Sequence, residues 1–154
     1  MKKYIPGFEN IRLLDSSARV GIRESRRVIG EYILKHEDLL KETIFEDAIV
    51  ILASTVDIHT SSAVIYTPGE CMSPYSIPYR SVVARDLDNM WMAGRNVSAD
   101  RYAHGAVRVM PPSIAMGQAA GIAASLACKT NVKAKDVPYG ELRTILMKQN
   151  AYLG

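Results

Sequence analysis

The sequence is poor in cysteine, with only Cys71 and Cys128 among its 154 residues. Two cysteines cannot build the disulfide framework of a small secreted domain, and no pair has the spacing of a metal-ligand motif, so we expect no metal site. Neither sign of charge is in large excess, because 19 basic and 16 acidic residues leave a net charge of +3. So small an excess does not by itself predict a nucleic-acid-binding protein.

Long apolar runs are absent as well. The residues that follow Met1 include two lysines but no apolar stretch, so no signal peptide is visible. If Met1 is the native start, we therefore expect a cytoplasmic protein. Residues 110–128 carry no charge, but they are rich in alanine and glycine, which contribute little free energy of transfer into lipid. We expect a buried helix there and no membrane span.

The composition that remains is that of a folded domain of ordinary size, with 48% hydrophobic and 23% charged residues. β-Branched or apolar composition predicts strands over residues 18–29, 45–58, 77–83 and 90–93. Helical patterns cover residues 37–43, residues 113–128 and an amphipathic C-terminal stretch that Asp136 is expected to cap. Residues 95–112 are interpreted as a long polar loop.

The segment from Met90 to Leu126 is the most informative. A short apolar strand ends at Gly94, a polar loop follows, and a helix begins near Ser113. The first N–H groups of a helix lack partners within it, so this arrangement suits an anion or a polarised carbonyl. Small residues then recur at spacings of three and four, which allows close approach of a strand or a ligand: Gly117, Ala120, Gly121, Ala124 and Cys128. Packing against a sheet without any ligand is the alternative interpretation.

Several segments resemble, in the same order, the C-terminal flavin-binding part of bacterial FAD-dependent oxidoreductases. The segments are PGFEN (6–10), GIRESRRVIGEY (21–32), IPYR (77–80), MWMAGRNVSA (90–99), HGAVRVMP (104–111) and MGQAAGIAA (116–124). The resemblance covers almost the whole chain. It implies a flavin fold of the glutathione reductase and fumarate reductase type, and hence an α/β or α+β protein. We expect a β-rich, substrate-domain-like part over residues 1–85 and the C-terminal portion of a Rossmann-like FAD-binding domain over residues 86–154.

The resemblance also draws attention to a missing motif. Enzymes of this kind hold the pyrophosphate of FAD on a G-x-G-x-x-G turn, and no three glycines of this chain have that spacing. The chain therefore looks like the C-terminal part of a longer enzyme. We expect it to need the N-terminal half as a partner, to bind FAD weakly alone, and to self-associate through uncovered strand edges.

The resemblance implies which residues contact the flavin: Gly94, Arg95, Asn96, Ser98, Ser113, Ile114, Gly117, Gln118 and Gly121. Many flavoproteins place an acidic residue for the ribityl hydroxyls where this chain has Arg95, so that contact is expected from Asn96 or Ser98. The N–H groups at Ser113 and Ile114 are expected to face the flavin's pyrimidine edge, where negative charge develops on reduction.

His104 and Arg108 are the candidate catalytic residues. The pattern His104-Gly105-x-x-Arg108 is similar to one in fumarate reductases and aspartate oxidases, whose arginine binds a substrate carboxylate, a task that suits the planar guanidinium. A salt bridge of Arg108 with Asp100 or Glu24 is the alternative. His104 is a candidate proton donor or flavin contact, with a purely structural role as the alternative. The glycine-rich run that follows the arginine in those enzymes is missing here, which argues against a dicarboxylate substrate.

The expected activity is hydride transfer between a small substrate and the N5 atom of FAD. A non-catalytic binding or assembly module that keeps the fold without flavin is the alternative, as is a subunit whose site is completed by a separate chain. Arg23, Arg26 and Arg27 form a basic group of the kind found on nucleic-acid surfaces. Because Glu24 lies among them, we expect a strand there and no nucleic-acid partner.

Overall fold

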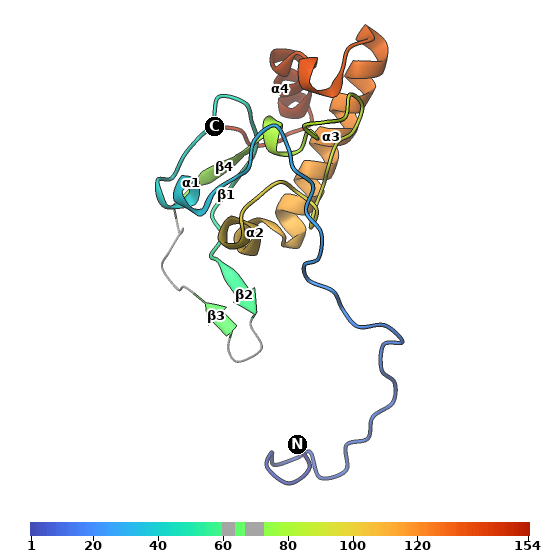
Figure 1. Ribbon diagram of the computed structural model, residues 1–154. Helices are drawn as coiled ribbons and strands as arrows, with labels where there is room; N and C mark the ends of the chain where they lie inside the picture. Colours follow the sequence, from blue (N-terminus) through green and yellow to red (C-terminus); the bar gives the residue numbers. More distant parts are fainter. Residues whose placement is uncertain (60–63, 67–72) are drawn as a thin grey trace.

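The computed structural model describes residues 1–59, 64–66 and 73–154 (Figure 1). Its α-helices are α1 (His36–Leu40), α2 (Arg101–Val107), α3 (Met110–Thr130) and α4 (Tyr139–Lys148). Its strands are β1 (Ala48–Leu52), β2 (Asp57–His59), β3 (Val64–Tyr66) and β4 (Tyr75–Pro78). Two short 3-10 helices span Tyr79–Ser81 and Ala134–Asp136. The expected mixed α/β class is confirmed.

The strands form two antiparallel pairs. In the first, Val50 of β1 lies opposite Ile77 of β4, and the register shifts between Ala48 and Val50. In the second, Ile58 of β2 lies opposite Ile65 of β3. All four residues of β4 are buried, and α3 packs against both β1 and α4 (Figure 1). The first pair therefore supplies more of the core, to which the second pair adds Ile58 of β2.

The core joins parts of the chain that are far apart in sequence. Its largest fully buried side chains include Leu34, Leu39, Tyr75, Met116 and Leu142. The apolar face predicted for the C-terminal helix is confirmed, because Leu142 and Leu146 of α4 are 0% and 1% exposed. The predicted cap is wrong, since Pro138 precedes α4 and Asp136 belongs to the preceding 3-10 turn.

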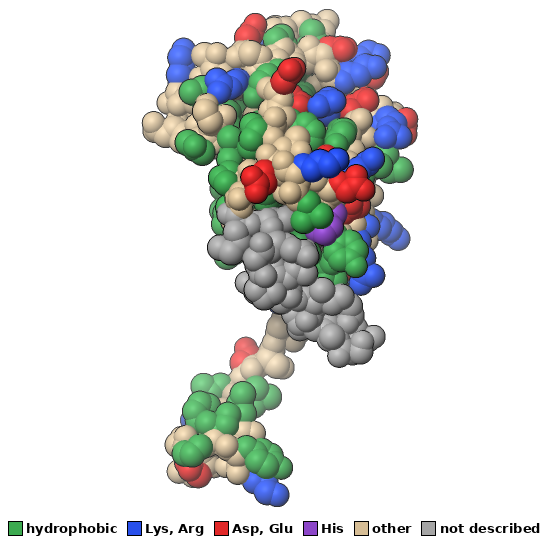
Figure 2. All heavy atoms as spheres, turned by 90° about the vertical axis from the view of Figure 1, so that its left-hand side faces the viewer, with side chains coloured by type: hydrophobic (Ala, Val, Ile, Leu, Met, Phe, Trp, Pro, Cys, Tyr) green, Lys and Arg blue, Asp and Glu red, His purple; other side chains and the backbone are tan. Residues whose placement is uncertain are grey.

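The N-terminal residues form an extended arm below the rest of the chain (Figure 1). Hydrophobic side chains are prominent on this arm in the space-filling view (Figure 2). Its exposed large apolar residues include Tyr4, Ile5, Phe8, Leu13 and Leu14. Burial of these side chains would stabilise the arm, but the described part of this chain does not provide it.

The prediction of a strand over residues 18–29 is wrong. This segment is extended and mostly exposed, with Val20 88% and Ile29 56% exposed. Its contacts with the rest of the chain include the hydrogen bond from Val28 N–H to the Asn96 carbonyl, and a single bridge joins Gly30 to Ala84. β-Branched composition favours extended backbone, but a strand also requires a neighbour for its hydrogen-bond ladder.

The other predicted strands are only partly correct. The stretch 45–58 contains β1 and the start of β2, separated by irregular backbone, and the stretch predicted to begin at Ile77 is a strand only as far as Pro78. The apolar run 90–93 is not a central strand. It makes one bridge, between Trp91 and Val83. The Trp91 indole N–H donates to the Tyr79 hydroxyl over 2.7 Å, so side-chain contacts help hold this run in place.

Two helix boundaries also differ from the prediction. The predicted helix 37–43 is α1, which ends at Leu40. The helix predicted from Ser113 begins at Met110, because Pro111 and Pro112 occupy its first turn, where proline's missing N–H costs nothing. The polar loop 95–112 contains α2, whose N-cap Asp100 accepts the Ala103 N–H over 2.8 Å.

None of the helices in the described residues has both the length and the apolar character needed to cross a membrane. Within the same residues, no three His, Cys, Asp or Glu side chains are grouped so that they could hold a metal ion. Cys71 lies outside the described residues, and Cys128 is an exposed free cysteine on α3.

Candidate functional site

A sharp turn at Gly94 directs the chain to the start of α3. Gly94 has φ +86°, a backbone conformation that favours glycine, and its carbonyl accepts the Val97 N–H over 3.1 Å. A Cβ atom added to Gly94 would lie 3.6 Å from the Ser113 hydroxyl oxygen. Gly94 therefore lies beside Ser113 in the first turns of α3.

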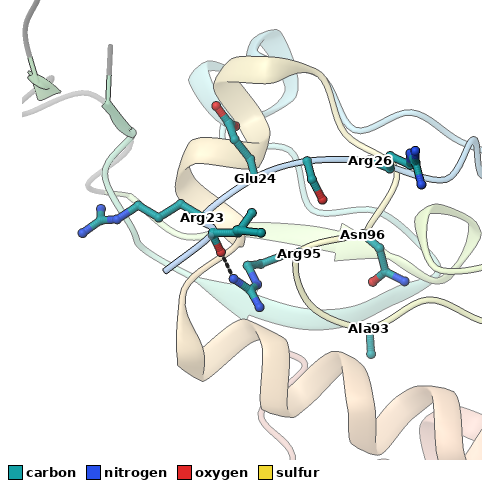
Figure 3. A pocket seen from close by; sticks show the side chains of 8 residues that line it. Arg23, Glu24, Arg26, Ala93, Arg95 and Asn96 are labelled. Carbon is teal, nitrogen blue, oxygen red and sulfur yellow. Dashed lines mark hydrogen bonds between the residues drawn. The ribbon is translucent and has the colours of Figure 1, made fainter. Parts of the chain in front are cut away.

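A cavity of about 380 Å³ opens beside this turn (Figure 3). One wall is the extended segment 22–26, and the other wall is formed by Ala93, Arg95 and Asn96. The two walls are tied together, because the Arg95 guanidinium donates to the Ile22 carbonyl and the Asn96 carbonyl accepts the Val28 N–H. The segment that was wrongly predicted to be a strand therefore forms one wall of this cavity.

The cavity walls are rich in arginine. Arg23, Arg26 and Arg95 line the cavity together with a single carboxylate, that of Glu24. A second cavity of about 290 Å³ shares Arg23 and Arg95 with the first and adds Asp57, Arg108, Val109 and Met110. Each cavity therefore has a wall with more positive than negative charges, which favours anionic or strongly polar ligands.

His104 lies behind the first cavity and is completely buried. Its Nε2 atom is 2.9 Å from the Arg95 carbonyl oxygen. Its Nδ1 atom has no hydrogen-bond partner among the described residues, but it lies at ion-pair distance, 3.3 Å, from Oε2 of Glu24. A side chain without exposed surface cannot touch a molecule in the cavity while this arrangement persists, so any direct role of His104 as a proton donor requires an intermediary.

Arg108, which follows α2, is also nearly buried, with a side chain 6% exposed. Its guanidinium donates to the Asp57 carbonyl over 2.7 Å and lies 3.8 Å from Oε2 of Glu24. Of the two salt-bridge partners considered from the sequence, Glu24 is therefore present. The Asp100 carboxylate instead accepts backbone N–H groups, from Ala103 and His36. A contact of Arg108 with substrate stays a prediction.

The N-terminus of α3 offers fewer free donors than expected. Pro111 and Pro112 have no N–H, and the Ser113 N–H already donates to the Val109 carbonyl over 3.2 Å. The Ser113 hydroxyl donates to that same carbonyl over 2.7 Å. Of the three residues that open the helix, Met110 alone has an N–H to present to a ligand. The expectation that the Ser113 N–H is a free helix-terminal donor is therefore wrong.

A family model described as FAD dependent oxidoreductase matches residues 1–146 of the chain. The chain belongs to this family. No curated protein and no solved structure matches it. The resemblance drawn from the sequence motifs is thus confirmed at the level of the family. FAD is the cofactor that membership of the family implies.

The structure separates the predicted flavin contacts into three groups. Arg95 and Asn96 line the first cavity, and Ser113 packs beside Gly94, which precedes them in the chain. Ser98 is 2% exposed and packs near Gly30, where a Cβ on the glycine would lie 2.8 Å from the serine Cβ. Its hydroxyl has no partner among the described residues, yet it does not line the cavity.

The remaining predicted contacts lie on α3. Ile114 is 73% exposed, and a Cβ added to Gly117 or Gly121 would meet nothing within 4 Å. Gln118 donates from its side-chain amide to the Gln149 side chain over 2.8 Å. At Gly117 and Gly121 this face of α3 therefore meets open space among the described residues, contrary to the close packing expected of the small-residue stripe. Flavin contact at these four residues stays a prediction.

The residues at the first cavity fit part of FAD. Guanidinium and amide groups from Arg26, Arg95 and Asn96 are the hydrogen-bond donors that a phosphate or the carbonyl edge of an isoalloxazine ring requires. The sequence motif located Arg95 and Asn96. It did not locate Glu24, Arg23 and Arg26 as cavity residues, and the one available signal was a lone acid within a basic run.

Proposed function

We propose that this chain forms one side of the flavin and substrate site of an FAD-dependent oxidoreductase, which transfers hydride between a small substrate and FAD. The arginine-rich cavity beside the Gly94 turn carries the proposal, because it combines the family's flavin motif with space for a ligand. Bound FAD would supply the hydride acceptor at its N5 atom. The protein's contribution is to bind, orient and set the charge around the reacting groups.

Arg95 and Asn96 would hold a polar edge of FAD, and Gly94 would allow the backbone to approach it. Arg108 would act mainly by fixing the segment 22–26 through Glu24, since its guanidinium is committed to groups of this chain. The positive walls would favour a substrate or cofactor part with negative charge.

Binding of FAD to the purified 154-residue chain tests the proposal. Because the chain has no G-x-G-x-x-G turn, we expect the isolated chain to bind FAD weakly or not at all, and binding to rise when the N-terminal half of the enzyme is supplied. Isothermal titration calorimetry and flavin absorbance measure both. Stoichiometric FAD on the chain as purified would contradict the expectation of weak binding.

The contribution of the cavity is measured with Arg95→Met. Losing a charge-assisted hydrogen bond costs about 1.5–3 kcal/mol, so we expect FAD binding to be weaker by roughly ten-fold or more. The affinity is measured for the chain alone or with the N-terminal half, whichever gives a measurable value. Lys148→Met is the matched control, because Lys148 is an exposed residue at the end of α4. Equal affinities for the two variants would show that the flavin does not bind at this cavity. Failure to bind FAD even with the N-terminal half present would favour a non-catalytic module.

A further inference from the structure

Glu24 differs chemically from every other residue that lines the first cavity. Its ionisable neighbours there are Arg23, Arg26 and Arg95, which remain protonated in proteins. Among the described lining residues, Glu24 is therefore the single side chain that can gain or lose a proton at ordinary pH. Hydride removal from an alcohol or amine carbon also requires the removal of a proton from its oxygen or nitrogen, and the cavity needs a group that accepts it.

The carboxyl group of Glu24 connects the cavity with the buried interior. The Glu24 side chain is 33% exposed, while His104 is 0% exposed, and 3.3 Å separate Oε2 from Nδ1. In Figure 3 the Glu24 side chain leaves the extended segment and reaches toward the neighbouring helix. One carboxyl group thus contacts both a cavity and a histidine that has no access to the cavity.

The hydrogen-bonding needs of His104 indicate a proton between the two side chains. A carbonyl oxygen can only accept, so Nε2, at 2.9 Å from the Arg95 carbonyl, carries a proton. In a neutral ring Nδ1 would then be an acceptor facing Oε2 of Glu24, which is also an acceptor when ionised. A proton on either atom removes this conflict. As placed, the 3.3 Å contact has ion-pair distance without hydrogen-bond geometry, so sharing the proton requires a turn of the Glu24 carboxyl group toward Nδ1.

Arg108 is the other charged group beside the Glu24 carboxyl group. Its guanidinium lies 3.8 Å from the same Glu24 oxygen. Arg108 is itself held by the Asp57 carbonyl, and the Asp57 carboxylate lies 3.3 Å from the guanidinium of Arg23. Glu24 therefore lies between Arg108 and His104, with a face toward the cavity.

We propose that Glu24 is the acid–base residue of this cavity and that His104 is its positioning residue, the two sharing one proton. The inference rests on the proposed function for the nature of the cavity ligand, an alcohol or amine substrate. With FAD bound as the hydride acceptor, the substrate O–H or N–H bond would break as the carbon loses its hydride, its electron pair would form the C=O or C=N bond, and its proton would go to Glu24. In the reverse direction Glu24 returns the proton.

The shared proton is tested by NMR of the ring nitrogens of His104 in the purified chain. We expect Nδ1 to carry a proton in the wild-type chain, because this is the proton that Glu24 shares. We also expect Glu24→Gln to change the Nδ1 signal, because the carboxylate that faces Nδ1 is removed. Arg26→Gln is the control, because it removes a charge from the same cavity wall without removing a described contact of His104, and it should leave the Nδ1 signal unchanged.

A His104→Gln variant assigns the signal among the three histidines of the chain. An unchanged Nδ1 signal in Glu24→Gln, or an unprotonated Nδ1 in the wild-type chain, would overturn the proposal. If Glu24→Gln does not fold, Glu24→Asp replaces it, since its shorter side chain moves the carboxylate away from Nδ1 and should change the same signal. An unchanged signal in Glu24→Asp would then count equally against a shared proton.

Access of Glu24 from the cavity is tested by carbodiimide coupling of glycinamide, followed by peptide mass spectrometry. We expect modification of Glu24 as well as of the exposed control Glu37. Modification of Glu37 without Glu24 would exclude the proposed contact between Glu24 and a cavity ligand. Neither the carbodiimide coupling nor the NMR of His104 requires FAD. A failure of the flavin proposal therefore shows in the FAD-binding measurements, and a failure of the Glu24 proposal shows in these two experiments.

Discussion

Gly30 is the position where the extended segment makes its closest approach to the core. A Cβ atom added there would lie 2.8 Å from the Cβ of Ser98, 3.0 Å from the carbonyl oxygen of Val83 and 3.1 Å from that of Arg80. Two of these three neighbours are backbone atoms, which no side-chain rotation can remove. Gly30→Ala must therefore displace backbone on one side of the contact.

We expect Gly30→Ala to destabilise the chain by about 1–3 kcal/mol, the usual cost of added volume in a close-packed site. A urea m-value of roughly 1–3 kcal/mol per molar converts this into a midpoint lower by on the order of 1 M. Displacement of Gly30 would also move the segment that carries Glu24, so the contact of Glu24 with His104 should weaken in the same variant.

Gly121→Ala is the matched control, since it adds the same methyl group to a glycine with open space around it. In the interior of α3 alanine is favoured over glycine by about 0.5–1 kcal/mol, so the urea midpoint should rise. Equal or higher stability of Gly30→Ala relative to the wild-type chain would show that the close approach at Gly30 is not present in solution.

Two further predictions concern buried polar groups. Tyr79→Phe should lower the free energy of unfolding by about 1–3 kcal/mol, measured with urea, because it leaves the Trp91 indole N–H and the Ala134 carbonyl without their partner. Burial raises the pKa of Tyr79 to about 12, against about 10 when unfolded. The stability from its neutral hydroxyl should therefore be complete below ~pH 10 and lost toward ~pH 12, and this loss should be smaller in Tyr79→Phe. Arg108→Met should cost about 1–3 kcal/mol because the Asp57 carbonyl loses its donor. Arg23→Met, in an ion pair whose arginine is 59% exposed, should cost less than about 1 kcal/mol. Equal costs would contradict the burial of Arg108.

The helices of the C-terminal part were predictable because their signals are local. The apolar spacing of Leu142, Ile145 and Leu146 specifies a helix face from neighbouring residues alone, and the structure buries two of the three deeply. Pro111 and Pro112 indicate a helix start as well. Their position within the first turn, rather than before it, explains why α3 begins three residues earlier than predicted.

The strands were harder to predict because pairing is not a local property. Residues 18–29 and 90–93 have suitable composition, yet 90–93 makes one bridge, Trp91 with Val83, and the bridge nearest to 18–29 is that of Gly30 with Ala84. The buried strands β1 and β4 differ because they face each other along most of their length. Their paired residues, from Leu52 with Tyr75 to Ala48 with Pro78, are 23 to 30 positions apart in the sequence. Composition indicates which residues tolerate extended backbone, whereas the fold decides which of them obtain a partner.

The same distinction separates the predictable from the unpredictable residues of the site. Gly94, Arg95 and Asn96 are consecutive, and a sequence motif is sufficient to find them. Glu24 and His104 are 80 positions apart, and their contact exists only because the extended segment lies across α2. A sequence pattern could suggest a salt bridge between Arg108 and Glu24 but not that the same carboxylate would also face a cavity.

The exposed face of α3 shows why the effect of Gly121→Ala depends on what binds to this face. The stripe of Gly117 and Gly121 is the pattern of a helix that another backbone or a flavin approaches closely, yet in the described chain it meets open space. Alanine at Gly121 should therefore stabilise the chain alone. If the N-terminal half and FAD cover this face, the same methyl group should oppose their binding. A variant that is more stable alone and binds FAD less tightly in the completed enzyme would place the flavin on this face. Unchanged FAD affinity would mean that this face makes a looser contact or is exposed to solvent in the completed enzyme.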